Sequence, residues 1–447
     1  MKLRAIFFWL FSVGLCLLTW QYIAYAEDEK TPPTGLTLDK CIEIAIKRST
    51  EILNARRDEE IAESRIRQVR SQVFPQLDAE AGYMRLDEAG GIPDTPIVFG
   101  RTDNYSAGLN ASQLLYSGGA VHAAMNAAGN YREMSRLDVA TRQRLVVRDV
   151  TRAFYEILFA HTRIAVSRQS VLQLEEFEKE AHLKYTNGTI SEFDWLSAKV
   201  SLANERPKVV RDRNSFAIAK ADFAKMLHFE DDNFNLIGKM EFKPVRNVTE
   251  ELLVLGMERR PELLASATRI ELSENDMQIT RAKLLPELRA RATYEGKNPD
   301  QQNMSAADNW GWHWNAGFDL TWNVLDGGLR RAQLMEKTLT RDKAKADYSE
   351  LGRQVRLEIK RASLLLRHAR EIVESSGQTV DLAQKAYDIA EVRYTKGLST
   401  YLEFTDSNLA LSQAKMNQAL AITRYLQALA DLRFACGVER LPGEEQE

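Results

Sequence analysis

Few residues of this 447-residue sequence could carry out covalent or metal chemistry, and those that could are far apart. After the N-terminal segment the cysteines are Cys41 and Cys436. The histidines are scattered along the chain: His122, His161, His182, His228, His313 and His368. No Cys/His spacing fits a zinc site, and no nucleophile elbow, P-loop or glycine-rich dinucleotide turn occurs. The sequence therefore offers no support for an enzyme, a metal site or a cofactor.

Residues 312–328, WHWNAGFDLTWNVLDGG, instead suggest a segment with one face for lipid and one for water. Apolar side chains alternate with polar or small ones from Trp312 to Val324, and a period of two predicts a β-strand with unlike faces. The apolar face carries tryptophan at both ends, which suits a strand that crosses a bilayer, because aromatic rings prefer the two interfaces. The edge of a soluble sheet also alternates in this way, so this stretch alone leaves both interpretations open.

Residues 104–119, NYSAGLNASQLLYSGG, repeat this pattern. Tyr105 aligns with Trp314, and a Gly-Gly pair ends both stretches. Two more alternating stretches, each following a proline, bring the number of predicted membrane strands to four. The aromatic residues of these strands form a predicted girdle: Tyr83, Tyr105, Tyr294, Trp312, Trp314 and Trp322. The repetition favours the membrane interpretation.

The first 26 residues have the features of a secretory signal peptide. A basic start is followed by an apolar run from Ile6 to Leu18 and by a small-x-small site that ends at Ala26. No later segment offers about 18 consecutive apolar residues, so we expect any membrane contact to be made by β-strands or at the membrane surface. The formal net charge of −3 comes without a basic patch, which argues against a nucleic-acid partner.

Helices are predicted for most of the remaining chain. Between about Gly118 and Lys184 apolar residues recur at helical spacing with almost no helix breaker, which predicts a helix about 100 Å long. A Tyr-x-x-Gly turn ends this helix. The other helices are predicted at 38–73, 190–227, 251–285, 329–394 and 399–435. The chain is thus two copies of one unit, which is helix, strand, strand, long helix, turn and helix.

This unit sets the predicted domain organisation and fold. The divisions are a signal peptide (1–26), a first repeat (27–227), an equatorial connection (228–250), a second repeat (251–436) and a C-terminal tail (437–447). We predict a mainly α fold with a small β part, in which a long α-helical barrel of coiled-coil hairpins continues four membrane β-strands. Two shorter helices placed end to end match the length of each long helix, so the strands and the turns lie at opposite ends.

Four strands are too few to close a barrel, because the smallest single-chain barrels of outer membranes have about eight. The barrel must therefore be shared between chains. Two chains would form a narrow barrel filled by its own side chains, whereas three would form twelve strands with room for a lumen. The polar parity of the strands, rich in Asp, Glu, Asn, Gly, Ser and Thr, favours a watery interior.

Three motifs occur once in each repeat. They are the helix–Pro–strand entry (Phe74-Pro75-Gln76-Leu77 and Leu285-Pro286-Glu287-Leu288), the strand–Gly-Gly–helix exit, and the tips Tyr185-x-x-Gly188 and Tyr394-x-x-Gly397. Two copies in the same order, behind a signal peptide, resemble the outer membrane efflux protein family, the TolC-like proteins. The resemblance covers both halves of the chain.

The resemblance implies a homotrimer with a twelve-stranded β-barrel in the cell outer membrane and a helical barrel in the periplasm. It further implies a passive exit duct of a tripartite efflux or type I secretion system. The duct would contact outer-membrane lipid and would open when a periplasmic membrane fusion (adaptor) protein and an inner-membrane efflux pump or ABC exporter dock. Such a duct is generic, so the sequence does not choose between a drug, a metal ion and a protein as cargo.

The resemblance also implies where the channel narrows. Acidic residues that follow the second tip glycine would line the constriction, namely Glu403 and Asp406, with Asp194 as the counterpart in the first hairpin. Three copies of Glu403 and Asp406 would favour cations. The alternative is that these acids only stabilise the first turns of their helices, where the positive end of the helix dipole lies. The predicted tip turns, which would dock the adaptor, are formed by Tyr185, Gly188, Tyr394 and Gly397.

Two questions stay open at the level of sequence. Cys41 begins the first helix and Cys436 ends the last, so either a disulfide in the oxidising periplasm or two free thiols would fit. A periplasmic coiled-coil adaptor or scaffold is the alternative function, since it too combines helical hairpins with β-structure. Adaptors typically carry one hairpin, whereas this chain has two hairpins and four strands of membrane type.

Overall fold

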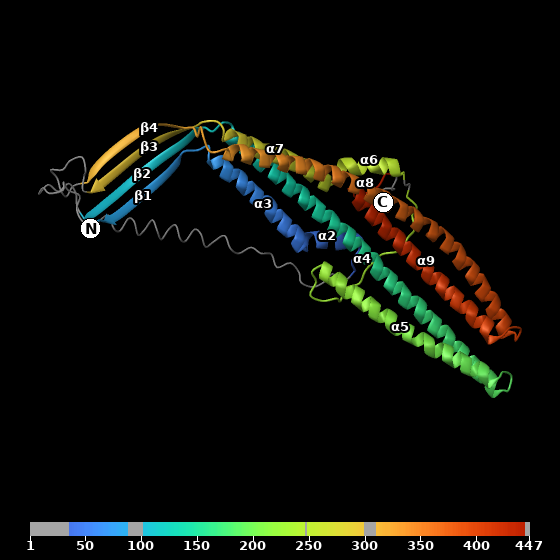
Figure 1. The fold of residues 1–447 in the computed structure, drawn as a ribbon. Helices are drawn as coiled ribbons and strands as arrows, with labels where there is room; N and C mark the ends of the chain where they lie inside the picture. The colour runs from blue at the N-terminus through green and yellow to red at the C-terminus, as the bar shows by residue number, and fades with distance from the viewer. Residues whose placement is uncertain (1–34, 88–101, 246–247, 299–309, 443–447) are drawn as a thin grey trace, which may run out of the picture.

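The computed structural model describes residues 35–87, 102–245, 248–298 and 310–442. The chain is elongated, with a four-stranded sheet at one end and the turns of two helical hairpins at the other (Figure 1). The predicted signal peptide, residues 1–26, lies outside the described residues. No helix in the described ranges is both long enough and apolar enough to cross a membrane.

The sheet is antiparallel and has the order β1-β2-β3-β4, so β1 and β4 are its edges. Its strands are β1 (Gln76–Arg85), β2 (Asp103–Tyr116), β3 (Glu287–Asn298) and β4 (Gly311–Thr321). The register aligns the alternating patterns, because Leu77 pairs with Ala111, Ala111 with Ala292, and Ala292 with Ala316. Apolar residues therefore share one face and polar residues share the other, as period two requires.

The predicted girdle residues lie on the apolar face, and several of them contact one another. The ring centroids of Tyr83 and Tyr105 are 5.1 Å apart, and those of Tyr294 and Trp312 are 5.0 Å apart. Trp314 is 76% exposed in the single chain. Trp322 follows β4, where its indole N–H donates to the carbonyl oxygen of Leu284 at 3.1 Å. A large apolar face without a cover within one chain marks a surface for lipid or for another chain.

Each hairpin of strands continues into a helix of 67 residues, α4 (Ala120–Thr186) or α8 (Leu329–Thr395). At 1.5 Å per residue each is about 100 Å long, as the pattern predicted. Gly119 and Gly328 precede these helices with φ of +89° and +93°, a region that glycine enters without a steric penalty. The duplicated Gly-Gly pairs thus turn the chain from sheet to helix.

The shorter helices line up beside α4 and α8 in two tiers (Figure 1). Near the sheet lie α3 (Thr50–Ser71) and α7 (Pro261–Ala282), and near the turns lie α5 (Glu192–Met226) and α9 (Tyr401–Cys436). In the tier near the turns, α4 contacts α5 and α9, and α9 contacts α8. The neighbour order there is α5–α4–α9–α8, which leaves α5 and α8 at opposite edges.

The structure corrects two predicted helices, each of which is broken once. The helix predicted at 38–73 is α2 (Leu38–Arg48) and α3, and the one predicted at 251–285 is α6 (Thr249–Arg259) and α7. The breaks fall at Ser49 and Arg260, whose ψ angles of 117° and 118° leave the helical region. Pro261 explains the second break, because proline disfavours the helical conformation in the residue before it. Ser49 has the same backbone conformation without a following proline.

The breaks lie at the middle of the molecule, in a region that we call the belt: α2, residues 228–245, α6 and residues 437–442. One buried cluster joins Leu36, Phe154 of α4 and Phe234, and Leu36 donates to the carbonyl oxygen of Asn235 at 2.8 Å. A second cluster joins Leu252, Ile359, Tyr425, Cys436 and Leu441. The chain ends and the connection between repeats therefore pack around the middle of α4 and α8.

The possible disulfide between Cys41 and Cys436 is not formed in this structure. Both are free thiols, and each is buried in a different cluster of the belt, Cys41 beside α4 and Cys436 beside α8. Burial raises the pKa of each thiol to about 12. Because the thiolate is the reactive form, both groups are inert as well as separated.

Candidate functional site

The turns at the far end of the hairpins share one backbone design. Gly188 and Gly397 have φ of +71° and +72°, and each follows the last turn of its long helix. Thr189 donates its N–H to the carbonyl oxygen of Lys184 at 2.9 Å, and Leu398 donates to that of Arg393 at 2.8 Å. A glycine in the left-handed region is the usual way to complete such a turn. The four predicted tip residues thus lie at two tight turns.

The start of α5 gives Asp194 a local partner. The Asp194 N–H donates to the Ser191 hydroxyl oxygen at 3.2 Å, and the Asp194 carboxylate accepts from the Ser191 hydroxyl at 2.7 Å and from the Ser191 N–H at 3.3 Å. This reciprocal pair is a capping box, which satisfies donors that the first helical turn leaves free. The carboxylate of Asp194 therefore stabilises the helix start, as one of the two hypotheses for these acids states.

Glu403 and Asp406 differ from Asp194 in this respect. Thr400 accepts the Glu403 N–H at 3.3 Å, so the Glu403 backbone is capped while its carboxylate is left unused. Both carboxylates are exposed, and neither forms an ion pair with any residue that the structure describes. Three positions apart on a helix, they share one face, away from the buried Phe404. Their arrangement suits carboxylates directed at a common space.

An aromatic cluster binds the second tip to the first hairpin. The ring of Phe177 on α4 lies 3.8 Å from that of Phe404 on α9 and 5.7 Å from that of Tyr394 on α8. The Lys184 ammonium group lies 4.3 Å above the centre of the Tyr394 ring, a cation–π contact. We call Phe177, Ala181, Ala198, Tyr387, Tyr394, Tyr401, Phe404 and Leu411 the tip cluster. It holds the turn beside Glu403 against α4.

Some buried polar groups in and beside the tip cluster lack hydrogen-bond partners among the described residues. They include the hydroxyls of Tyr394 and Ser399 and the side-chain carbonyl of Asn408. Burial raises the pKa of Tyr394 to about 12, and the nearby carboxylates of Glu180 and Asp194 add to the effect. An unpaired buried hydroxyl costs about 1–3 kcal/mol. The packing of this tip is therefore less stable than its apolar contacts alone would make it.

The first tip lacks such a cluster of its own. Tyr185 stacks on Trp195 with a centroid distance of 5.3 Å and an interplanar angle of 8°. The Trp195 indole N–H donates to Glu178 at 3.0 Å. These contacts join α4 to α5 within one hairpin. Sequence reasoning assigned Tyr185 and Tyr394 the same role and missed Phe177, Phe404 and Tyr387, because helical spacing does not show which hairpin a buried face meets.

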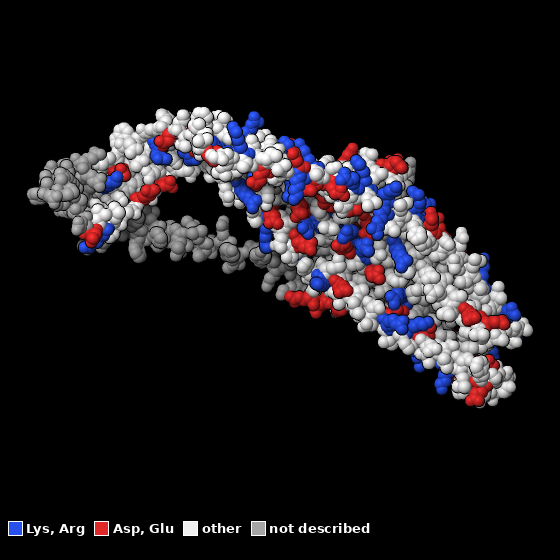
Figure 2. Space-filling view, viewed as in Figure 1, with Lys and Arg blue, Asp and Glu red and all other residues white. Residues whose placement is uncertain are grey.

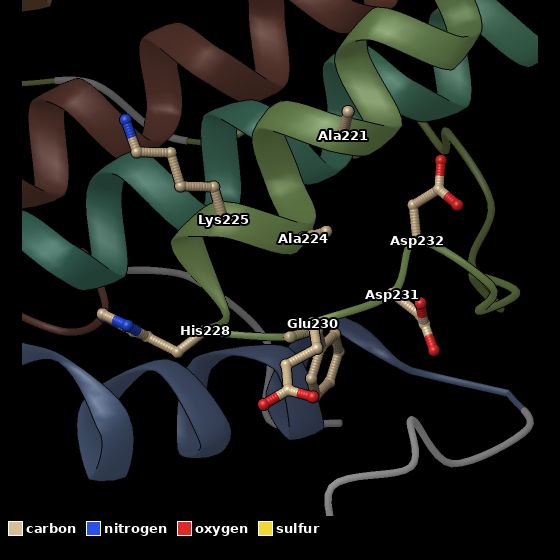
Figure 3. Close-up of a pocket in the computed structure, with 8 residues that line it drawn as sticks. Ala221, Ala224, Lys225, His228, Glu230, Asp231 and Asp232 are labelled. Carbon is tan, nitrogen blue, oxygen red and sulfur yellow. The ribbon is translucent and has the colours of Figure 1, made fainter.

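The described surface away from the tips includes a pocket whose polar side chains do not converge. A pocket of about 570 Å³ at the end of α5 is lined by Lys225, His228, Glu230, Asp231 and Asp232. Figure 3 shows these polar side chains pointing in different directions rather than toward one point. Within the described part of the chain, no three His, Cys, Asp or Glu side chains are grouped so that they could hold a metal ion.

The fold and the tips together define an elongated channel subunit, in which an apolar-faced sheet continues into a long helical bundle that ends in acidic tips. The profile of the family described as "Outer membrane efflux protein" matches residues 41–227 and 252–438, one match in each repeat. The chain belongs to the outer membrane efflux protein family. It is accordingly an outer-membrane component of an efflux system, with its helices in the periplasm.

Individual relatives are distant but cover most of the chain. The pyoverdine export outer membrane protein OpmQ of Pseudomonas aeruginosa is 23% identical over 82% of this chain and 77% of its own length. Outer membrane protein TolC of Vibrio cholerae is 21% identical over 82% and 83%. The solved structure of the Campylobacter jejuni CmeC outer membrane channel has a TM-score of 0.78 at 16% identity, over 93% of this chain and 90% of that one. These likenesses confirm the predicted fold class and the internal duplication.

Proposed function

We propose that three copies of this chain form a passive exit duct, with a twelve-stranded barrel in the outer membrane and a helical barrel in the periplasm. The observation that carries the proposal is the match between the open edges of the single chain. The sheet ends in β1 and β4, and the tier of helices near the turns ends in α5 and α8. An open strand edge seeks a partner strand, and four strands per chain reach a wide barrel when three chains combine.

The two strand edges are also compatible in shape. On the apolar face both edge strands mix large and small side chains. On β4 Trp314 and Phe318 flank Ala316, and on β1 Leu77 and Tyr83 flank Ala79 and Ala81. Large residues beside small ones pack well across neighbouring strands. The opposite face carries charged and polar residues and would line a watery lumen. We assign no catalytic step to the chain, because a duct requires a path and a gate rather than a reaction.

The gate in this proposal is the acidic end of α9. Three copies of Glu403 and Asp406 place six carboxylates around the narrowest part of the duct, where their combined field favours cations. Asp194 supports the gate indirectly, through the cap of α5. The tips also expose Phe193, Leu398 and Leu402, apolar side chains that a periplasmic adaptor would cover when it docks. Docking of the adaptor and of an inner-membrane pump or exporter would open the gate, and the pump would select the cargo.

The test is planar-bilayer conductance of the detergent-purified mature protein beside the double variant Glu403→Gln, Asp406→Asn, which removes charge and keeps shape. We expect small, cation-selective openings from the wild type. In the variant we expect the ratio of cation to anion permeability to fall toward one, with weaker block by multivalent cations. Glu192→Gln, an exposed acid in the first turn of α5, is the matched control and should leave selectivity unchanged.

Each other outcome has a definite meaning. A wild type that conducts, with a double variant of the same selectivity, would remove Glu403 and Asp406 from the gate and leave the duct intact. A protein that inserts into no bilayer and stays soluble without detergent would overturn the duct in favour of a periplasmic scaffold.

A further inference from the structure

The two repeats are in register from the strands to the end of the second hairpin. Gly119 and Gly328 precede the two long helices, which are of equal length, and Gly188 and Gly397 form the two turns. Each residue of α4 or α5 therefore has a counterpart 209 positions later in α8 or α9, the difference between these glycine numbers. A contact seen between α4 and α9 can be carried over to α8 and α5 residue by residue.

The contact between α4 and α9 contains a partly exposed ion pair. The Arg152 guanidinium on α4 donates to the Asp431 carboxylate on α9 at 2.5 Å. One turn further along, Gln427 on α9 donates its amide to the Glu156 carboxylate at 3.2 Å. These two pairs join the first hairpin to the second within one chain.

The counterparts of these four residues lie on α8 and α5. Arg361 replaces Arg152 and Asp222 replaces Asp431, so the ion-pair chemistry is the same. Leu365 replaces Glu156 and Ile218 replaces Gln427, so a polar contact becomes an apolar one. Each pair of counterparts is still complementary, because Arg361 and Asp222 have opposite charges and Leu365 and Ile218 are both apolar.

In the single chain these four counterparts are exposed. Leu365 and Ile218 are 50% and 55% exposed. Arg361 and Asp222 are exposed as well, and neither forms an ion pair with another residue that the structure describes. Since α5 and α8 are the two edges of the helical tier, they cannot meet within one chain. On the face in Figure 2, charged side chains are dense over the middle of the molecule and sparse over the α8–α9 hairpin.

We propose that α8 of one copy packs against α5 of a second copy of this chain. In this interface Arg361 pairs with Asp222 of the partner subunit, and Leu365 packs against Ile218 of the partner subunit. The interface repeats the geometry of the α4–α9 contact, so contacts within and between chains alternate around the ring. The inference rests on the trimer proposed above and specifies how its copies meet.

Further apolar residues extend the proposed interface along both edges. On α5 the exposed apolar residues include Leu196, Val200, Val210 and Ile218, and on α8 they include Leu364, Leu365, Leu382 and Ile389. Leu196 lies about one turn before Val200, and Ile218 lies about five full turns after it, so these three side chains lie near one face of α5. Two such faces would exclude water from the Arg361 pair and strengthen it.

The first test is cysteine cross-linking in the full chain. Ile218→Cys with Leu365→Cys, oxidised or treated with a short bismaleimide, should give covalent dimers and trimers on a denaturing gel. The matched control is Gln427→Cys with Glu156→Cys, which should link within one chain and leave the monomer mass unchanged. The native thiols are buried and should not react. Monomer only from the first pair would overturn the interface.

The second test is a charge exchange, read as the trimer fraction on a native gel. Asp222→Arg alone and Arg361→Asp alone each place like charges in the interface and should cause loss of the trimer, whereas the double variant should restore it. A double variant that stays dissociated while the wild type is trimeric would overturn the proposed pair and leave the exit duct standing. A wild type that is monomeric under the same conditions would overturn the trimer itself.

Discussion

The turn between α4 and α5 and the turn between α8 and α9 have the same sequence motif and nearly the same backbone. Gly188 and Gly397 differ by 1° in φ. Their surroundings differ, since Tyr185 stacks on Trp195 within its own hairpin, whereas Tyr394 is 5% exposed and packs on Phe177 of the other hairpin. A repeated motif thus determines how a turn is built, and packing between hairpins determines which of the two turns is anchored.

The counterparts across the repeats explain this asymmetry. Phe404 corresponds to Trp195, and Phe177 corresponds to Ala386. The contact between Phe177 and Phe404, which holds the second tip against α4, would therefore be only an alanine and a tryptophan in the interface between α8 and α5 of a partner. Within a chain the hairpins pack closely near their tips, and in the proposed interface between chains the same level would be packed less fully.

Among variants that test the difference between the two tips, the largest effect is expected from Phe404→Ala. The side chain is fully buried in the tip cluster, so its loss should destabilise the packing by about 3–5 kcal/mol. Hydrogen exchange should show faster amide exchange around Tyr387 and Tyr394, and the bilayer conductance of the closed channel should rise.

The matched control for that variant is Trp195→Ala in the first hairpin. Trp195 is half-buried, stacks on Tyr185 of its own hairpin and packs at the edge of the tip cluster, so we expect a smaller effect that is greatest at the first tip. Equal loss of protection at both tips after either substitution would show that the tips are not anchored differently.

An intermediate loss of stability is expected at high pH, and it should be localised at the second tip. Burial raises the pKa of Tyr387 and Tyr394 to about 12, from an ordinary value of 10.0. A raised pKa means that the folded tip favours the neutral phenol. The stability from this preference is fully present below pH 10 and is lost as the pH rises through about 12. Absorbance titration should show tyrosinate formation delayed into this range.

The double variant Tyr387→Phe, Tyr394→Phe tests the assignment of that delayed step. It should lose most of the late part of the titration and keep a remainder from Tyr401, whose pKa is also raised by burial, whereas the wild type in denaturant should titrate without delay. A late component of undiminished size in the double variant would contradict the assignment to Tyr387 and Tyr394. Since the Tyr394 hydroxyl has no partner among the described residues, Tyr394→Phe alone should not reduce stability.

The smallest effects are expected from the helix caps beside the turns. Ser191→Ala removes the acceptor of the Asp194 N–H and breaks a reciprocal cap, at a cost of about 1 kcal/mol. Thr400→Ala removes the acceptor of the Glu403 N–H and should cost less, because that cap works in one direction only. Exchange rates in the first turns of α5 and α9 would measure both, and Ser191→Asn, which keeps an acceptor, should retain most of the protection. A larger loss at Thr400 would reverse the comparison.

Much of the fold could be predicted from the sequence because its signals are local. Alternation at Trp312 and Tyr105 predicted strands and their apolar face, and the Gly-Gly pairs and tip glycines predicted the ends of the long helices to within about two residues. The break at Arg260 had a local signal in Pro261 that the prediction overlooked. The equivalent break at Ser49 has no such signal.

Less of the candidate site could be predicted, because its properties depend on neighbours far away in the chain. The resemblance grouped Asp194 with Glu403 and Asp406, and the structure separates them, since only the Asp194 carboxylate is used in a cap. The sequence left a disulfide between Cys41 and Cys436 possible, whereas the structure places the two cysteines in separate buried clusters.

By itself the sequence determined the repeating unit, the polarity of each strand face and the positions of the turns, because period, glycine and proline act through the backbone next to them. Only the tertiary structure decided that Phe177 meets Phe404, that Tyr394 packs on the other hairpin whereas Tyr185 stacks within its own, and that α5 and α8 are open edges. Those outcomes depend on which helical faces meet across hundreds of residues, and the free energy of that choice comes from burial of surfaces that no local pattern pairs.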